Sequence, residues 1–397
     1  MKIRLLKLAS LSFSILAVLT SCNKTLDITP KFQRGGNSVV LASNGNLVVA
    51  GYNSTSTNGY DAILVMTTDA NNDSIVWSAT YGGSYSDAFY CVKKSNTRGF
   101  IAAGFSNKAS ASSPAMFVAI TDANGKLIKS NSAYGKSGTY SQGLNVISDT
   151  DTSYLVSGYI QKSSSSDRNL YLVKINNAGD TLWTRNYGAK GANSNDSVND
   201  AAYGVIKAPG GGYFLTGNLN GYTNSGGRIF LMKVSAKGDS LWTKTFNRGI
   251  GYSLTLTRDN GVAICGSLQQ GTNQDIFLIK TDTAGNLLWK QSYGGSGFEY
   301  GATMVETSGG GFAISGITDS KGSGLQDVCL ILTSSSGAAT WEQTKTFGGG
   351  DNDQGFGLIE MSDKGFCITG LSNTEGSFIF LNRTSSDGAQ GWVKYIK

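Results

Sequence analysis

The sequence repeats one short phrase at a nearly constant interval, and this repetition restricts the chain to a small set of folds. Seven copies of an apolar phrase closed by glycine run from "NLVVAG" at 46–51 to "GFCITG" at 365–370. The closing residues are Gly51, Gly104, Gly158, Gly217, Gly266, Gly316 and Gly370. A period of about 50 residues indicates an array of equivalent supersecondary units, each covering its neighbours.

Each unit contains four strand-like runs, which in the last copy read "GFGLIEM", "GFCITGL", "SFIFLNR" and "GWVKYIK". Polar turns such as "RDNG" at 258–261 and "DTAG" at 282–285 join the runs, as in β-hairpins. Runs such as "GFAISG" are apolar at consecutive positions, so both faces of each small sheet must be covered. We therefore predict an all-β fold, a seven-bladed β-propeller with four antiparallel strands per blade, over residues 35–397.

Two further positions recur in phase. All six tryptophans fall at the same place in the last strand of a unit: Trp77, Trp183, Trp242, Trp289, Trp341 and Trp392. We interpret them as locks between neighbouring sheets; the alternative is an exposed aromatic ladder for sugars. Fifteen residues before each closing glycine stand Gly36, Phe89, Gly143, Ala202, Gly251, Gly301 and Gly355. Small residues there predict an innermost strand crowded at the axis, and Phe89 is an exception that the sequence does not explain.

The first residues form a different kind of segment. Lys2, Arg4 and Lys7 precede an apolar run at 11–19 that is too short to span a bilayer as a helix. The tetrapeptide at 19–22, "LTSC", resembles a bacterial lipoprotein lipobox. The resemblance implies a signal peptide at 1–21, lipidation of Cys22 and a tether at 22–34; the alternative is an ordinary secretion signal. Asn23 after the cysteine favours, by the same analogy, the outer membrane, with the side of that membrane left open.

Composition excludes several classes of function. The chain has no histidine, so Ser-His-Asp or Cys-His catalysis and His-ligated metals are impossible. Three of the basic residues behind the net charge of +6 lie in the predicted signal peptide, so the mature chain is only weakly basic. No basic run interleaves with aromatic residues, which argues against a nucleic-acid partner. We expect a monomer without cofactor or metal.

The repeat also resembles a known family. The pattern D-x-x-L-x-K-x-D-x-x-G-x-x-x-W-x-x-x-[YF]-G-G, best matched by residues 275–295, is similar to a repeat of secreted bacterial and archaeal propellers. Its Gly-x-x-x-Trp phrase resembles the tryptophan-docking repeat of quinoprotein-like propellers, which include an envelope lipoprotein that assists outer-membrane assembly. The resemblance implies a propeller in the cell envelope, although those relatives usually have eight blades.

Candidate ligand-binding residues lie where the copies differ. The loops between the second and third runs, and between successive units, are long and share one face of the disc, whereas the other turns are short. Four acidic residues begin the innermost strands: Asp87, Asp200, Glu299 and Asp353. They are interpreted either as acceptors for turn N–H groups or as a partial carboxylate ring for a cation or sugar hydroxyl. Nearby aromatic residues that could stack on a sugar or a partner side chain are Tyr85, Tyr140, Tyr222, Phe298 and Tyr300.

The remaining cysteines are Cys91, Cys265, Cys329 and Cys367, each in a strand run of a different unit. We predict buried thiols at small core positions, with disulfides or metal ligands as the alternative. Together these features favour an outer-membrane-anchored lipoprotein that acts as a non-catalytic binding or scaffold module for a protein or glycan. Two alternatives remain: a carbohydrate-active enzyme that uses Asp/Glu and Tyr at the propeller mouth, and a periplasmic outer-membrane assembly factor.

Overall fold

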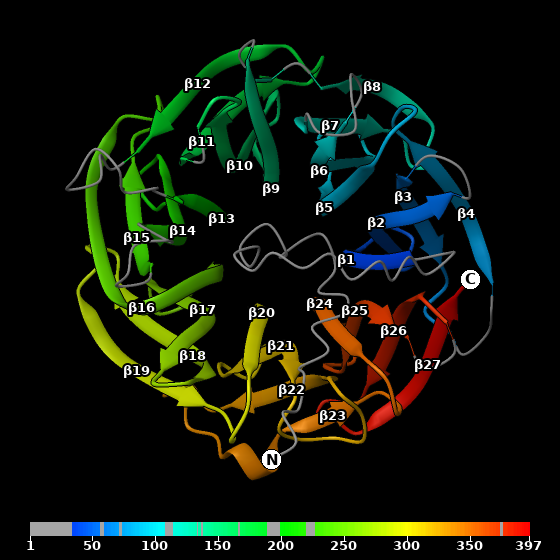
Figure 1. Ribbon diagram of the computed structural model, residues 1–397, viewed down its shortest axis with the longest axis vertical. Helices are drawn as coiled ribbons and strands as arrows, with labels where there is room; N and C mark the ends of the chain where they lie inside the picture. The colour runs from blue at the N-terminus through cyan, green and yellow to red at the C-terminus, as the bar shows by residue number, and fades with distance from the viewer. Residues whose placement is uncertain are drawn as a thin grey trace, which may run out of the picture.

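Antiparallel sheets follow one another around a central axis in the computed structural model of the chain (Figure 1). The structure describes residues 34–55, 59–70, 74–107, 114–132, 134–135, 138–165, 167–188, 199–219, 227–373 and 376–397. Cys22, Tyr222 and the predicted signal peptide therefore lie outside the described residues. The all-β propeller built from four-stranded antiparallel units, predicted from the repeats, is confirmed.

Five of the sheets have four strands and one has seven. The first three sheets contain β1 Arg34–Leu41, β2 Leu47–Thr55, β3 Gly59–Thr67 and β4 Ile75–Tyr81; β5 Asp87–Lys94, β6 Phe100–Ser106, β7 Ala115–Thr121 and β8 Leu127–Asn131; β9 Thr139–Thr150, β10 Ser153–Lys162, β11 Arg168–Asn176 and β12 Thr181–Tyr187. The seven-stranded sheet contains β13 Ala201–Lys207, β14 Tyr213–Leu219, β15 Arg228–Val234, β16 Ser240–Leu256, β17 Gly261–Gln270, β18 Asn273–Asp282 and β19 Leu287–Tyr293. The last two contain β20 Glu299–Glu306, β21 Phe312–Thr318, β22 Asp327–Thr333 and β23 Lys345–Phe347, preceded by the short helix η2 Trp341–Gln343, and β24 Asp353–Glu360, β25 Phe366–Ser372, β26 Phe378–Thr384 and β27 Gln390–Ile396.

The large sheet arises from one unusually long strand. β16 has 17 residues, pairs with β15 up to Arg248, and pairs with β17 from Gly249 onward. One continuous strand is thus the outer strand of one four-stranded unit and the innermost strand of the next. The described strands consequently form six sheets, and the predicted count of seven separate blades is not confirmed.

The innermost strands share a β-bulge. In β1, β5, β9, β13, β16, β20 and β24 the pairing register shifts at the same place in the repeat. The residues skipped by the pairing are Asn37, Tyr90, Leu144, Tyr203, Tyr252, Ala302 and Phe356. A bulge bends its strand and re-aims a side chain, and here it recurs wherever the chain passes closest to the axis (Figure 1).

The residue before each bulge packs against the preceding sheet, which explains the small residues predicted at the axis. A Cβ added to Gly36 would stand 2.9 Å from Val49 Cγ1 and 3.0 Å from Ile379 Cγ2. Phe89 is accommodated because it packs among small residues, including Ala50 and Ala62, in one core cluster. Its ring stacks on Phe117 at 5.3 Å, so one large side chain fills a space that side chains of the neighbouring sheet fill elsewhere.

Tryptophans on outer strands press against the next sheet, as the sequence predicted. The turn glycines Gly125, Gly238, Gly285 and Gly337 would each collide with an indole ring if they carried a Cβ, those of Trp77, Trp183, Trp242 and Trp289 in turn. All four glycines have positive φ, between 77° and 81°. Glycine is therefore required here by conformation and by contact together. Trp341 differs, because it lies in the helix η2.

Tyrosines near the ends of outer strands complete this docking. The hydroxyl of Tyr81 donates to the Gly125 carbonyl at 2.5 Å, and that of Tyr293 donates to the Gly337 carbonyl at 2.5 Å. Tyr134, just after β8, and Tyr187 make the same bond to Gly179 and Gly238. Gly125, Gly238 and Gly337 thus each receive an indole ring and a tyrosine hydroxyl from the preceding sheet, whereas Gly179 receives the hydroxyl beside Lys129.

The ring closes between the last and first sheets, with β27 as the fourth strand of the last sheet. Their buried side chains form one apolar cluster that includes Val49 and Ile379. Arg383 of β26 bonds to Asp69 beyond β3 at 3.1 Å and to Asp363 at 2.7 Å. Lys394 of β27 donates to Thr67 Oγ1 at 2.8 Å. We call this junction the seam.

Candidate functional site

The four predicted carboxylates begin innermost strands, but each is fully buried: Asp87, Asp200, Glu299 and Asp353 have 0% exposure. Three of them accept a hydrogen bond from the backbone of the glycine four residues earlier. Gly83 N–H donates to Asp87 at 2.8 Å, Gly295 to Glu299 at 3.0 Å, and Gly349 to Asp353 at 2.7 Å. The Gly-Gly phrase before each acid therefore folds over its carboxylate and caps it.

Two of these carboxylates each lie close to the carboxylate of another acidic residue: Asp353 lies close to Asp327, and Glu299 lies close to Asp275. Asp327 Oδ1 and Asp353 Oδ2 each lie 2.6 Å from the point where a Cβ on Gly348 would stand. Burial raises the pKa of Asp327, and the neighbouring charge of Asp353 raises it further, against hydrogen bonds that lower it. Burial and the charge of Glu299 raise the pKa of Asp275 in the same way.

These pairs hold loops rather than face solvent. Asp327 is 2% exposed, and Glu299 also accepts bonds from the hydroxyls of Thr318 and Ser320. Within the described ranges, no group of three or more acidic, cysteine or histidine residues could hold a metal ion. A general acid or base must reach its substrate within hydrogen-bond distance, and a capped, fully buried carboxylate does not meet that condition.

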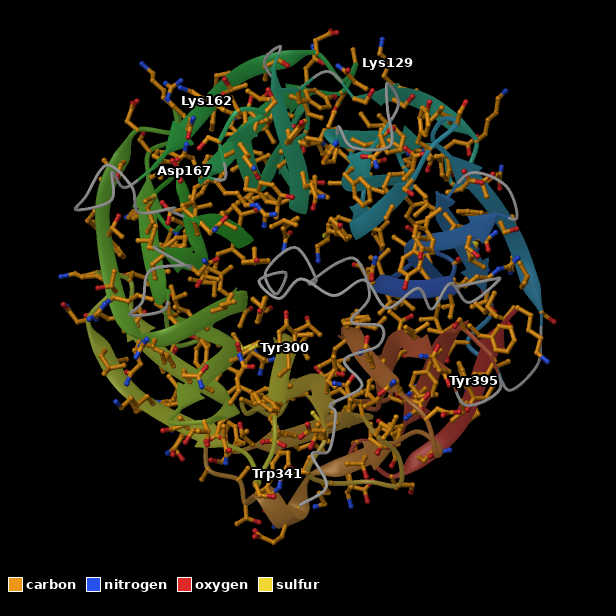
Figure 2. The ribbon with its side chains drawn as sticks, viewed as in Figure 1. Lys129, Lys162, Asp167, Tyr300, Trp341 and Tyr395 are labelled. Carbon is orange, nitrogen blue, oxygen red and sulfur yellow. The ribbon has the colours of Figure 1, made fainter. Side chains whose placement is uncertain are left out.

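The predicted aromatic residues do not gather in one place. Tyr85 and Phe298 are 39% and 48% exposed in the loops before β5 and β20. Tyr140 is half-buried at the start of β9. Tyr300 lies beside the axis (Figure 2), where its ring centroid is 4.2 Å from that of Tyr252. Tyr85 and Phe298 are therefore the exposed aromatic residues that this set offers to a partner.

The sequence reasoning missed an aromatic cluster near the axis. Two of its rings belong to the bulge residues Tyr203 and Tyr252, which meet at 4.9 Å, and Tyr252 also meets Tyr300. A further bulge residue, Tyr90, packs against Phe105 at 5.7 Å. Burial raises the pKa of Tyr90 and Tyr300 well above the ordinary value, so both stay protonated at neutral pH. A sequence signal for this cluster existed: the residue that follows the small axial residue is aromatic in four of the seven copies. That this residue lies in a β-bulge cannot be read from the composition.

The four cysteines of the described residues are free and buried, as predicted. Burial raises the pKa of Cys367 to about 12. Such a thiol is almost entirely protonated at neutral pH and behaves as a small apolar side chain.

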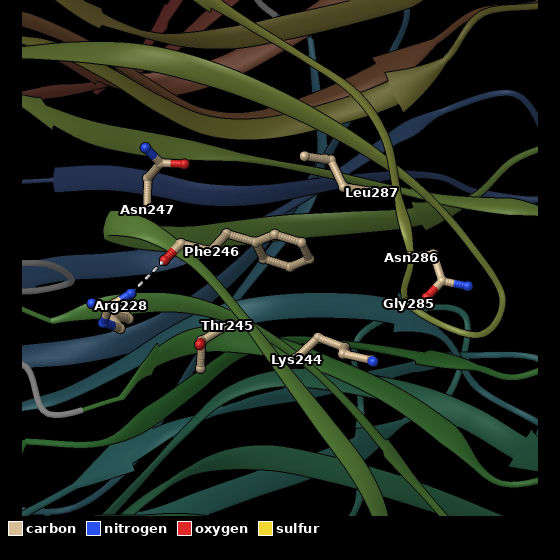
Figure 3. Close-up of a pocket in the computed structure, with 8 residues that line it drawn as sticks. All are labelled: Arg228, Lys244, Thr245, Phe246, Asn247, Gly285, Asn286 and Leu287. Atoms are coloured by element: carbon tan, nitrogen blue, oxygen red, sulfur yellow. Dashed lines mark hydrogen bonds between the residues drawn. The ribbon is translucent and has the colours of Figure 1, made fainter.

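The perimeter carries two further features that the sequence did not predict. Large aliphatic side chains are exposed on β4, β8, β12, β16 and β19. They are Ile75, Val76, Leu127, Ile128, Leu182, Leu241, Leu287 and Leu288. Among them a recess of about 600 Å³ opens beside β16 (Figure 3). We call this the β16 recess; its lining includes Arg228, Lys244, Phe246, Asn247, Asn286 and Leu287.

The recess lies where the docking of neighbouring sheets is incomplete. Trp242 still presses on Gly285, its ring 2.7 Å from the position of an added Cβ. The residue in phase with Tyr187 and Tyr293 is Phe246, which has no hydroxyl to donate to the Gly285 carbonyl. The Phe246 ring is half-buried and faces Leu287 across the recess (Figure 3). Phe347 and Ile396 occupy the same position in their own strands, so the hydroxyl is absent at three junctions, and at one of them the perimeter opens into the recess.

No helix among the described residues is long and apolar enough to cross a membrane.

Comparisons with known proteins bear on the fold alone. No family model and no curated relative matches the sequence. Among solved structures, the BP39L lectin from Burkholderia pseudomallei has a TM-score of 0.55 at 10% identity, covering 93% of this chain and 99% of that chain. Sqt1 from Chaetomium thermophilum has a TM-score of 0.51 at 10% identity, covering 91% and 84%. The Dos1 propeller has a TM-score of 0.50 at 10% identity, covering 91% and 85%. The fold is that of a β-propeller.

Proposed function

We propose that the chain is a lipid-anchored, non-catalytic binding module, a seven-bladed propeller that presents its long-loop face to a protein or glycan partner. The blade count is supported by the seven bulges, since each marks one passage of the chain along the axis. On this count β16 contributes its first half to one blade and its second half to the next.

The capped carboxylates carry the non-catalytic part of the proposal. Asp87, Glu299 and Asp353 are fully buried and accept bonds from the glycine loops above them. Two of these loops also leave an aromatic side chain exposed, Tyr85 before Asp87 and Phe298 before Glu299. Aromatic side chains give contact area with little loss of conformational entropy, and they anchor many binding surfaces.

Proteins of similar fold offer precedents for both kinds of partner. One is named a lectin, and a second structure of Sqt1, with a TM-score of 0.50 at 9% identity, is bound to the N-terminus of the ribosomal protein L10. The lipobox-like "LTSC" and Asn23 support an anchor at Cys22 in the outer membrane. The tether at 22–34 then joins the anchor to the propeller.

The experiment uses the lipidated chain as bait in detergent-solubilised envelope membranes, beside a glycan array. A double variant, Tyr85→Ser with Phe298→Ser, should lose the captured partner or glycan signal. Leu182→Ser removes an equally exposed apolar side chain from the perimeter and should not change capture. Blank results from both assays, or equal loss in both variants, would refute binding at this face.

The anchor is tested separately. Labelled palmitate should be incorporated by the native chain and not by Cys22→Ser, which should be released from the membrane fraction. Protease treatment of intact cells then decides between the surface and the periplasm. Incorporation of label by Cys22→Ser would rule out the anchor while leaving the binding face untouched.

A further inference from the structure

The β16 recess combines charges of one sign with apolar side chains. Arg228 and Lys244 lie in its wall and are exposed, and none of the residues that line it is acidic. Lys290 of β19 adds a third cation at the edge, its Nζ 3.5 Å from Asn247 Oδ1. The apolar part consists of Phe246 and Leu287, the latter 48% exposed. A ligand that satisfies this lining must carry negative charge and hydrocarbon together.

The backbone of β16 supplies a third element. Over residues 240–248 its one partner among the described strands is β15. Within this stretch the Phe246 carbonyl accepts a hydrogen bond from Arg228 Nη1 at 3.4 Å (Figure 3). The edge opposite β15 has no strand partner among the described residues. Such an edge is a template on which an extended peptide can add as a further strand. Leu241 of β16 and Leu288 of β19 are both 57% exposed.

We propose that the β16 recess binds an extended, acidic segment of a partner protein, which adds to the outer edge of β16. An apolar side chain of that segment lies between Phe246 and Leu287, and its carboxylates pair with Arg228 and Lys244. An acidic polysaccharide would satisfy the cations but would leave the leucines and the strand edge without partners. This site lies on the perimeter and is independent of the binding proposed for the long-loop face.

The probe is a fluorescein-labelled octapeptide of alternating glutamate and leucine, titrated against the full chain by fluorescence anisotropy. Lys244→Glu should weaken its binding by about tenfold or more, because it places a carboxylate against those of the peptide. The matched control is Lys207→Glu, an exposed lysine at the end of β13 with the same change of net charge. Equal loss in the two variants would reduce the effect to overall charge and overturn the proposal.

A second variant tests the recess without changing its charge. Phe246→Tyr supplies the hydroxyl that tyrosines use at four other junctions, toward the Gly285 carbonyl. It should fix the ring against the Gly285 turn, so that the ring no longer receives the apolar side chain of the peptide, and weaken peptide binding by about tenfold, while the melting temperature is kept or raised. Unchanged binding by a folded Phe246→Tyr chain would overturn the placement in this recess.

Modified probes test the mode of binding. A peptide N-methylated at alternate amides cannot complete a strand ladder and should lose binding. A lysine-leucine octapeptide should not bind. Retained binding of either probe, or competition by polygalacturonate or by phosphatidylglycerol vesicles as strong as by unlabelled peptide, would overturn the proposal. The Tyr85→Ser, Phe298→Ser variant should bind the probe normally, so failure at one face is distinguishable from failure at the other.

Discussion

The seam and the β16 junction join neighbouring sheets in opposite ways. At the seam the two sheets come from opposite ends of the described chain. They are joined by side chains and by a backbone hydrogen bond from the Arg34 N–H to the Ser377 carbonyl at 3.2 Å. Arg383 and Lys394 cross the boundary to Asp69 and Thr67. At β16 a single strand passes from one unit into the next, so backbone continuity joins the two. Both junctions lack the docking tyrosine, because Phe246 stands in its place at β16 and Ile396 stands in its place at the seam.

The two junctions also differ in the size of the space between their neighbouring sheets. At β16, where one strand spans two units, a recess of about 600 Å³ lies beside Phe246, which lacks the docking hydroxyl. At the seam, Ile396 lacks the hydroxyl too, and the neighbouring space is smaller. The space at the seam, about 360 Å³, lies beside the ion pair of Arg383 and Asp363.

The largest expected effect compares core truncations at the two junctions. Ile379 at the seam and Ile264 near β16 are both fully buried, so each change to alanine should cost about 2–5 kcal/mol of unfolding free energy. We expect Ile379→Ala to raise hydrogen exchange selectively in the first and last sheets, since these can part without stretching the chain. Ile264→Ala should instead raise exchange throughout the ring. The same exchange pattern in both variants would remove the distinction between the junctions.

The next effect tests the docking that remains at β16. Gly285→Ala introduces a methyl group 2.7 Å from the Trp242 ring at a φ of +79°. We expect a loss of about 2–3 kcal/mol, from overpacking and from the left-handed backbone together. Gly310→Ala is the control, because it has a φ of +88° and nothing within 4 Å of the new methyl. It should cost about 1 kcal/mol. Equal costs by chemical denaturation would mean that Trp242 does not press on this turn.

Much of this fold could be predicted from residue patterns. The repeated apolar phrases gave the four-stranded units, and the phased tryptophans and small axial residues gave the contacts between sheets. The merging of two units through β16 was not predicted, although a signal existed: the interval from Gly217 to Gly266 is 49 residues, the shortest of the six. Whether one strand such as β16 continues from one sheet into the next depends on the direction in which the chain leaves the first sheet. The residue composition does not contain that direction.

The candidate site was less predictable. Asp87, Glu299 and Asp353 stand at the predicted starts of inner strands, but their burial depends on how the Gly-Gly loops fold over them. Phe246 replaces tyrosine in the repeat, but Phe347 does so as well, and this replacement alone does not predict the recess. Whether a missing hydroxyl leaves a space depends on the neighbouring sheet, and that is a property of tertiary packing.

A smaller effect concerns the polar contacts of the seam. Arg383 is 8% exposed and bonds to two carboxylates, of which Asp363 is largely exposed. Because solvent screens that partner, we expect Arg383→Met to cost only about 1–2 kcal/mol. Lys244→Met, at the rim of the β16 recess, should change stability by less than about 0.5 kcal/mol. Urea unfolding measures both, and a larger loss for Lys244→Met would invert the proposed ranking of the junctions.

The smallest effect is a difference in pH dependence. The hydrogen bond from Arg383, with that from the Gly365 N–H, lowers the pKa of Asp363. The ionised Asp363 carboxylate therefore makes its full contribution to the free energy of unfolding above the ordinary aspartate pKa, about 3.9. This contribution is lost as the pH falls through the lowered pKa of Asp363. The melting temperature of Asp363→Asn should lie below that of the native chain at neutral pH, and the gap should close on acidification. Lys244→Met should show a constant difference over the same range, because no residue lining the recess is acidic. A gap for Asp363→Asn that does not narrow as the pH falls below the ordinary aspartate pKa, about 3.9, would mean that the seam does not depend on this ion pair.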